Sequence, residues 1–230
     1  MNLKSHIPNA FTLLNLLSGV IGIIWVLDGQ IVSGAYFILI SAGFDFFDGF
    51  AARILKVPSE IGKQLDSLAD LVSFGVLPGL ILFQMVKVES DIDWLPYLTL
   101  IIPLLSAYRL AKFNIDTRQT DQFIGLPTPA NALLISTIPY FAIAWPKIGI
   151  WLTSPFVLVG IAWVMAILLI LELPLIALKF KNFSVSQNVF RYILILVSLG
   201  LIIPFGLAGI PVIILAYIGL SIIENGKKRQ

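Results

Sequence analysis

The chain has 230 residues, of which 58% are hydrophobic and only 12% are charged, and its formal net charge is +2. An ordinary soluble domain carries about 25% charged residues, so this composition excludes a soluble globular protein and indicates an integral membrane protein. The chain has no cysteine, which excludes disulfides and thiolate–metal sites.

Eight segments are apolar enough to be membrane-spanning helices, each of which needs about 20 largely apolar residues. The sequence therefore predicts an all-α integral membrane protein in which one domain, 1–230, fills the chain. The first apolar stretch has no small-residue cleavage site after it, so it is expected to be a retained span. The predicted helices cover 11–27, 32–53, 63–87, 95–113, 128–145, 149–172, 188–205 and 207–224.

The basic residues predict the orientation. With eight spans, thirteen of the 15 basic residues lie on the side that holds both termini, and only Lys87 and Lys147 lie opposite. This bias marks the cytoplasmic face, so both termini are expected in the cytoplasm. Because the basic residues are scattered over several loops, they give no reason to expect a nucleic-acid partner. The thirteen are Lys4, Arg53, Lys56, Lys63, Arg109, Lys112, Arg118, Lys179, Lys181, Arg191, Lys227, Lys228 and Arg229.

Four aspartates lie in the apolar flanks of the second and third predicted helices. Asp45 and Asp48 share one arc of the second helix, near its cytoplasmic end. Asp66 and Asp70, four residues apart, share one face of the third helix. The connection between the helices is short, so the helices are antiparallel neighbours and the four carboxylates can meet at similar depth. An ionised carboxylate at membrane depth is costly and is rarely kept without a partner.

The chemistry of this cluster indicates metal-assisted phosphoryl-type transfer. Oxygen-only ligands suit hard cations such as Mg²⁺, Mn²⁺ or Ca²⁺. Gly49 and Ala52 leave room for a ligand beside the helix, and Arg53 has the planar fork that pairs with phosphate. A divalent-cation or proton-coupled transporter is the alternative, because intramembrane acids also line ion pathways. The acids gather at one membrane face, however, and paired interrupted helices are missing, which favours an enzyme.

The spacing of these residues resembles the signature of the CDP-alcohol phosphatidyltransferase family, within 45–70. Its eight fixed letters match Asp45, Asp48, Gly49, Ala52, Arg53, Gly62, Asp66 and Asp70. Members of the family move a phosphatidyl group from a CDP-linked lipid to an alcohol and release CMP. The resemblance implies two divalent ions, Mg²⁺ or Mn²⁺, held by the four aspartates, with Asp70 as the proton acceptor for the incoming hydroxyl. It implies that CDP rests against Asn9, Thr12, Asp48, Gly49, Ala52, Arg53 and Gly62.

Further segments resemble the serine-using branch of the family, the membrane-type phosphatidylserine synthases. They are 7–15, 65–75, and 108–114 followed by 123–130. The resemblance implies CDP-diacylglycerol and L-serine as substrates, and a homodimer in the cytoplasmic membrane of a prokaryote, with its active site at the cytoplasmic face. Arg109 and Lys112 end the fourth span beside a polar loop, where a zwitterionic amino acid needs a cation for its carboxylate.

Other acceptors stay open, namely glycerol-3-phosphate and inositol phosphate. Phosphatidylglycerophosphate synthases usually carry Lys directly after the last aspartate, where this chain has Leu71. The serine-using branch more often has Arg in place of Lys112, and Arg and Lys pair with carboxylates in different geometries.

Structural roles compete with these functional ones. Asn9 and Thr12 could cap the first helix. Arg109 and Lys112 could be ordinary residues of the cytoplasmic face. Ser73 follows the last aspartate on the same helical face, and it is expected to hydrogen-bond within its own helix.

Overall fold

The computed structural model describes residues 6–57, 59–116, 123–176, 184–185 and 188–228. Most of this part of the chain is helical, as predicted. The helices are α1 (His6–Leu27), α2 (Gly34–Leu55), α3 (Glu60–Asp70), α4 (Leu77–Glu89), α5 (Ile101–Ile115), α6 (Thr128–Ala144), α7 (Pro146–Leu152), α8 (Pro155–Ile170), α9 (Val189–Phe205) and α10 (Ile210–Lys228).

Shorter elements join the helices. Short 3₁₀ helices occur at Ile31–Ser33, Leu95–Leu100 and Gly206–Gly209, and a π-helical segment occurs at Leu71–Val76. Strands β1 (Phe123–Ile124) and β2 (Pro174–Leu175) pair antiparallel, with Phe123 opposite Leu175. This small sheet was not predicted, because two-residue strands leave no periodic pattern in a sequence.

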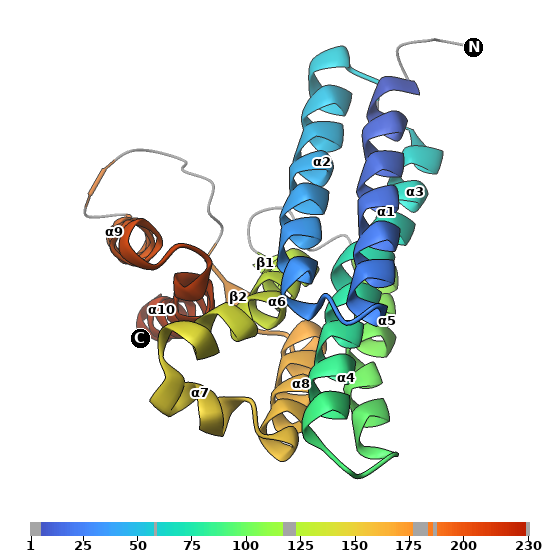
Figure 1. Cartoon of the computed structure of the whole chain (residues 1–230). Helices are drawn as coiled ribbons and strands as arrows, with labels where there is room; N and C mark the ends of the chain where they lie inside the picture. The colour runs from blue at the N-terminus through green and yellow to red at the C-terminus, as the bar shows by residue number, and fades with distance from the viewer. Residues whose placement is uncertain (1–5, 58, 117–122, 177–183, 186–187, 229–230) are drawn as a thin grey trace.

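Helices α1 and α2 form a long antiparallel pair, and α4 packs beneath them beside α5 and α8 (Figure 1). Ile38, Leu77 and Ile81 are completely buried in the core that these helices share. A Cβ atom on Gly22 would lie 2.7 Å from Phe37 and 2.8 Å from Leu77. The missing side chain therefore lets α1 approach α2 and α4 closely, as small residues do in membrane bundles.

The predicted helix 63–87 is one continuous helical run from α3 to α4, with the π-helical segment directly after Asp70. A Cβ atom on Gly19 of α1 would collide with Ser73 of this segment, and one on Gly75 would lie 2.9 Å from Ser106 of α5. The widened turn is thus held between two helices at small residues. Such π turns are frequent at functional sites.

The junction between α2 and α3 is short and capped at both ends. Lys56 takes the left-handed conformation, with a φ of 52°, and ends α2 with its N–H directed at the carbonyl oxygens of Ala52 and Arg53. Ser59 begins α3, and its hydroxyl oxygen accepts the N–H of Gly62 at 3.0 Å. These two caps return the chain beside α2, which places the aspartates of both helices together.

Five helical segments are long and apolar enough to cross a membrane, or six if a pair bent by 75° counts as one span. That bent pair is α7 and α8, so the prediction of a single helix over 149–172 is wrong. Ser154 is extended, and Pro155 begins α8. Proline has no N–H to continue the preceding helix but fits a first turn, which explains the break. The five segments are His6–Leu27, Ile31–Leu55, Glu60–Glu89, Leu95–Ile115 and Val189–Gly226.

The last of these segments is two helices, as predicted for 188–205 and 207–224. Gly206 has a φ of 54°, and a Cβ atom on Gly209 would lie 2.8 Å from the carbonyl oxygen of Leu201. Eight residues of straight helix would separate such positions by about 12 Å, so the chain turns back here. Helices α9 and α10 are seen almost end-on in Figure 1, whereas α1 and α2 are seen from the side. The number of eight crossings therefore stays a prediction.

Helix ends that were predicted to be cytoplasmic meet in the structure. The start of α1, the end of α2 and the start of α3 line one cavity. At the start of α3, the ammonium of Lys63 donates to the carbonyl oxygen of Asn114, at the end of α5 (2.7 Å). Five of the basic residues behind the orientation lie outside the described residues, namely Lys4, Arg118, Lys179, Lys181 and Arg229. The orientation itself stays a prediction.

Single-cysteine variants test this orientation without background, because the chain has no cysteine of its own. Gln64→Cys, on the exposed face of α3, should react with a membrane-impermeant maleimide only from the cytoplasmic side. Asp91→Cys, exposed after α4, should react only from outside. Reaction of both from the same side would contradict a crossing by α3 and α4, and exchanged sides would invert the orientation.

Candidate active site

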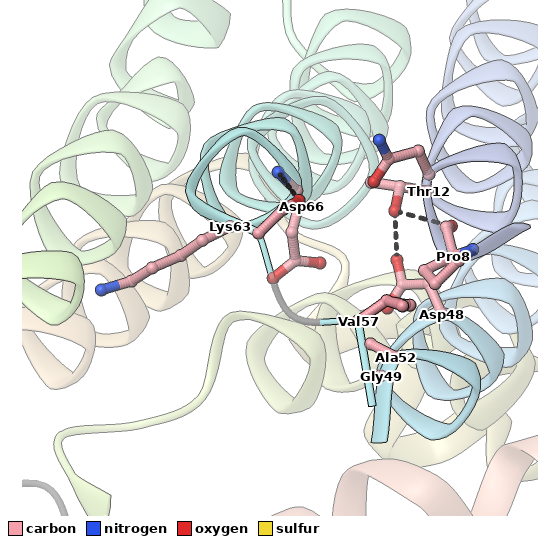
Figure 2. Close-up of a pocket in the computed structure, with 11 residues that line it drawn as sticks. Pro8, Thr12, Asp48, Gly49, Ala52, Val57, Lys63 and Asp66 are labelled. Atoms are coloured by element: carbon pink, nitrogen blue, oxygen red, sulfur yellow. Dashed lines mark hydrogen bonds between the residues drawn. The ribbon is translucent and has the colours of Figure 1, made fainter. Parts of the chain in front are cut away.

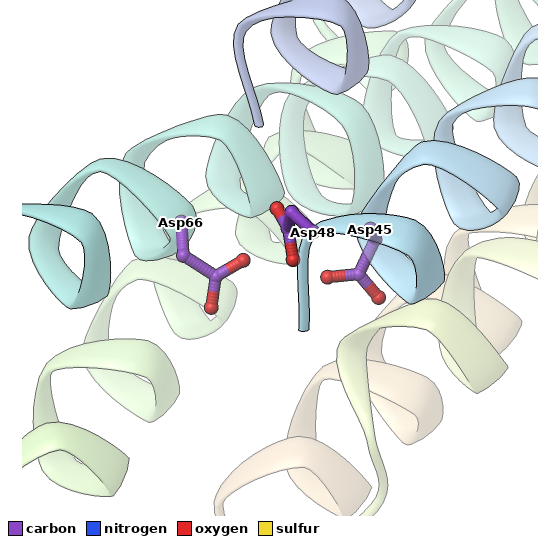
Figure 3. A group of neighbouring side chains, drawn as sticks. All are labelled: Asp45, Asp48 and Asp66. Carbon is purple, nitrogen blue, oxygen red and sulfur yellow. The ribbon is translucent and has the colours of Figure 1, made fainter. Parts of the chain in front are cut away.

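Three of the four predicted aspartates converge. Asp45 and Asp48 come from the last turns of α2, and Asp66 comes from α3; their carboxylates point toward one another in Figure 3. One oxygen from each lies within 4.8 Å of the other two. Asp48 is 7% exposed, and the other two side chains are half-buried. The convergence predicted from helical spacing is confirmed for this trio.

The trio fits a hard divalent cation. Among the residues whose side chains the structure describes, no Lys or Arg forms an ion pair with these carboxylates. One oxygen of Asp66, Oδ1, is buried without a hydrogen-bond partner in the same part of the chain. Buried carboxylate oxygens that lack protein cations are the donors that Mg²⁺ and Mn²⁺ prefer.

Asp70 stands apart from the trio, one turn after Asp66 on α3. Its side chain is 9% exposed, and the side-chain amide of Asn15 donates to its Oδ1 at 3.2 Å. Asp70 is not among the residues whose oxygens lie within 4.8 Å of one another. Its place as a fourth metal ligand therefore stays a prediction.

A small cavity of about 260 Å³ opens beside Asp48 and Asp66 (Figure 2). Six of the seven residues predicted to contact CDP line this cavity. They are Asn9, Thr12, Asp48, Gly49, Ala52 and Gly62. The seventh, Arg53, does not line it; its Nε donates to the carbonyl oxygen of Gly49 at 2.9 Å. The lining also includes residues that the sequence did not indicate, namely Pro8, Val57, Ser59 and Lys63.

Thr12 connects α1 to the aspartates. Its hydroxyl lies 2.7 Å from Oδ2 of Asp48, to which it donates, and 3.2 Å from the carbonyl oxygen of Pro8 (Figure 2). Helix α1 begins at His6, so Thr12 is inside the helix and the capping alternative is wrong for this residue. Thr12 instead fixes one oxygen of Asp48 at the wall of the cavity.

The two glycines of the motif act differently. A Cβ atom on Gly49 would meet nothing within 4 Å among the described residues, so this glycine leaves open space at the cavity. A Cβ atom on Gly62 would lie 3.2 Å from Oδ1 of Asn9. Gly62 therefore allows α3 to approach α1 at the rim of the cavity.

A second cavity, of about 630 Å³, lies on the other side of the carboxylates, and Lys63 and Asp66 line both cavities. Its apolar wall comes from α6, α9 and α10 and from the residue after β2, and consists of Leu133, Leu194, Ile213, Ile214 and Ile176. Its polar lining includes Asp45, Asp70, Arg109, Thr128 and Tyr217. The contribution of α9 and α10 could not be predicted, because no local pattern joins them to the aspartates.

Arg109 is the buried one of two cations, Lys63 and Arg109, among the described residues that line this large cavity. It is 8% exposed, its Nε has no hydrogen-bond partner among the described residues, and its guanidinium carbon lies 5.9 Å from the centre of the Phe113 ring. Thr128, which is 1% exposed, likewise has a hydroxyl without a partner there. Buried polar groups without partners call for a ligand or water, so these side chains are candidates for substrate contact.

Lys112 lies elsewhere, although it was predicted to act with Arg109. Its ammonium lies 2.8 Å from Oε1 of Glu172, and it does not line the large cavity. The ion pair also gives a partner to Glu172, an acid at the end of the predicted helix 149–172. The structure thus brings Arg109, and not Lys112, into the cavity of Asp70.

Ser73 corrects a further expectation. Its hydroxyl donates to the main-chain carbonyl oxygen of Asn15 on α1, at 3.0 Å. The predicted hydrogen bond within its own helix is therefore wrong. The π-helical segment turns Ser73 toward α1, which a regular helical spacing does not anticipate.

These features define a helical membrane protein with clustered aspartates between a small cavity that Asp48, Asp66 and Lys63 line and a large cavity with an apolar wall, as expected of an enzyme that acts on a lipid with a charged headgroup. Residues 5–218 match the model of one family, and the chain belongs to that family, the CDP-alcohol phosphatidyltransferases.

Similar proteins include several named CDP-diacylglycerol–serine O-phosphatidyltransferase. The one from Bacillus subtilis is 36% identical over 140 residues, which cover 59% of this chain and 76% of the relative. The one from Mycobacterium leprae is 32% identical over 178 residues, 74% of this chain and 57% of the relative. The one from Methanocaldococcus jannaschii is 36% identical over 129 residues, 56% and 58% of the two chains. The matches thus span little more than half the length of some of these relatives.

Removing one carboxylate of the trio should weaken metal binding. Asp45→Asn and Asp66→Asn should each reduce Mn²⁺ affinity by about 10-fold or more, because a charge-assisted contact is worth about 1.5–3 kcal/mol. Isothermal titration of the purified protein measures this affinity. Glu60→Gln, an exposed acid at the start of the same helix α3, is the matched control and should bind Mn²⁺ normally. Unchanged affinity in both trio variants would contradict a metal site here.

Proposed function

We propose that this protein transfers the phosphatidyl group of CDP-diacylglycerol to the hydroxyl of L-serine, which gives phosphatidylserine and CMP. Family membership supports the transfer of a CDP-linked group, and the names of the relatives favour serine. The observation that carries the proposal is the junction of the two cavities at the aspartates. A substrate with a nucleotide at one end and acyl chains at the other needs two unlike chambers that meet at the reacting phosphate.

The small cavity suits the nucleotide. Gly49 leaves open space in its lining, Lys63 adds a cation, and the pyrophosphate of CDP would lie toward Asp48 and Asp66. Arg53 is exposed beside this cavity, and its Nε donates to Gly49, so the Nη groups of its guanidinium would be the donors to a phosphate of the nucleotide. The apolar wall of the large cavity suits the glyceride end of the lipid.

Asp45, Asp48 and Asp66 would hold the divalent ions, either Mg²⁺ or Mn²⁺, and we propose Asp70 as the fourth ligand. When bound, the ions would supply charge neutralisation for the phosphates. Thr12 orients Asp48 by its 2.7 Å hydrogen bond, so this carboxylate is preorganised at the wall of the nucleotide cavity.

Asp70 is proposed as the general base. The serine oxygen attacks the phosphorus that carries the diacylglycerol, its proton passes to Asp70, and the bond from that phosphorus to the oxygen of CMP breaks. Asp70 lines the large cavity together with Arg109, so an acceptor held by Arg109 is within the same chamber as its base. Serine is a weak nucleophile at neutral pH, and alignment in the chamber should therefore matter as much as the base.

An acceptor comparison tests the proposal. Purified protein with CDP-diacylglycerol and Mn²⁺ should release CMP rapidly with serine and only slowly with glycerol-3-phosphate, inositol phosphate or ethanolamine. Rapid release with another acceptor would move the protein to a different branch of the family. Metal uptake into vesicles without CMP release under any condition would instead support the transporter alternative.

The carboxylate contact of serine gives a specific prediction. Arg109→Ala should raise the serine KM by about 10- to 100-fold, because a charge-assisted hydrogen bond contributes about 1.5–3 kcal/mol. The KM for CDP-diacylglycerol should stay near normal. Lys112→Ala should have a smaller effect on the serine KM, because the Lys112 ammonium already pairs with Glu172. Steady-state kinetics decide the matter, and an unchanged serine KM in Arg109→Ala would remove the proposed pocket.

The base gives a second prediction. Asp70→Asn should reduce kcat by about 100-fold or more, since a general base typically contributes 10²–10⁴, while nucleotide affinity should fall far less. Equilibrium binding of CDP alongside the kinetics separates the two effects. Equal losses in binding and rate would make Asp70 mainly a metal ligand.

We also retain the homodimer and the cytoplasmic location of the active site as proposals from the family resemblance.

A further inference from the structure

Asn15 of α1 is completely buried and hydrogen-bonds the proposed base. Its side-chain Nδ2 donates to Oδ1 of Asp70 at 3.2 Å. The residue ends the segment 7–15, which contributes Asn9 and Thr12 to the nucleotide cavity; Asn15 itself does not line either cavity. It therefore touches the reaction only through Asp70.

The main chain of Asn15 is held from two sides. Its carbonyl oxygen accepts the hydroxyl of Ser41 on α2 at 3.2 Å and the hydroxyl of Ser73 on the π-helical segment at 3.0 Å. The close approach of Gly19 to Ser73 fixes the distance between α1 and that segment one turn later. The amide of Asn15 is thus presented to Asp70 from a backbone that α2 and the π turn hold in place.

The bonding of the Asn15 amide is one-sided. Its Oδ1 is buried and has no hydrogen-bond partner among the described residues, so only the N–H side is used. A buried acceptor without a partner is unfavourable for stability. An apolar residue at position 15 would fill the same space without this cost, so packing alone does not explain the amide. The Asn15 amide therefore supplies a neutral hydrogen-bond donor to one oxygen of Asp70, Oδ1.

We propose that Asn15 is a positioning residue that holds Oδ1 of Asp70 and leaves Oδ2 to accept the proton of the acceptor alcohol. The inference rests on the proposed role of Asp70 as base. Thr12, one helical turn earlier, donates to Asp48 in the same way. Helix α1 therefore orients both groups of carboxylates, Thr12 on the side of the nucleotide and Asn15 on the side of the acceptor.

The test is a split between kcat and KM. Asn15→Leu keeps the side-chain volume but removes the donor, and it should lower kcat by about 10- to 100-fold, the usual effect of losing the partner that orients a functional group. The KM values for serine and CDP-diacylglycerol, and the Mn²⁺ affinity, should each change by less than about threefold, which is a small change in binding free energy. Asn15→Ala also removes the donor, and it should show the same split if Asn15→Leu does not fold.

Ser18→Ala is the matched control. The Ser18 hydroxyl, on α1 three residues after Asn15, donates to the carbonyl oxygen of Phe37 on α2 at 3.1 Å, so the variant removes a hydrogen bond between the same two helices without touching Asn15. It should lower Tm while kcat stays near that of the wild type.

Three results would overturn the inference. They are a kcat in the Asn15 variants within twofold of the wild type, a loss of metal or lipid affinity as large as the loss of kcat, and an equal loss of kcat in Ser18→Ala. Failure of the wild type to release CMP with any acceptor would instead contradict the proposed function, so the two outcomes are distinguishable.

Discussion

The burial of carboxylates in an apolar helical bundle is the constraint on which the rest of this structure depends. Asp45, Asp48 and Asp66 bring their oxygens within 4.8 Å of one another, and no described Lys or Arg side chain neutralises them. Such a group is unfavourable unless a cation joins it, because both desolvation and mutual repulsion oppose the charged forms. Metal binding would remove both penalties, so the site's instability without a metal and its affinity for one have the same origin.

Helix α1 makes this arrangement precise. Glycines at positions 19 and 22 let it pack closely on the π-helical segment, α2 and α4, and its polar residues then reach the aspartates across short distances. The hydrogen bonds that orient the aspartates therefore depend on the close packing that the small residues allow. The glycines of the motif extend it, since Gly62 admits α1 beside α3 and Gly49 leaves space for a ligand.

Features set by local spacing were predictable from the sequence, and features set by tertiary contacts were not. The convergence of the three aspartates follows from helical periodicity, and six residues that line the small cavity were indicated by the family resemblance of 7–15 and 45–70. The π-helical segment at Leu71–Val76 was missed because its residues have an ordinary helical pattern, and so was the contact of Ser73 with α1. The break before Pro155 had a local signal, the proline itself, which the length of the apolar run obscured.

The large cavity shows most clearly which features cannot be predicted from the sequence alone. Its walls come from α3, α5, α6, α9 and α10, and residues such as Leu194 and Ile214 are far from the aspartates in sequence. Apolar residues in a membrane protein carry no signal that separates lipid-facing from cavity-lining positions. The charges of Arg109 and Lys112 looked equivalent in sequence, and they are distinguished by the pairing of Lys112 with Glu172 and by the place of Arg109 in the large cavity.

The aspartates and the small cavity are proposed to form one site, in which metal and nucleotide phosphates meet. Electron–nuclear double resonance of the Mn²⁺-loaded protein with bound CDP tests this directly, because coupling between the metal's unpaired electrons and ³¹P falls steeply with distance. A clear ³¹P coupling is expected in the wild-type protein, and its loss is expected in Asp48→Asn. Tightly bound Mn²⁺ without any ³¹P coupling, while CDP is bound, would contradict it.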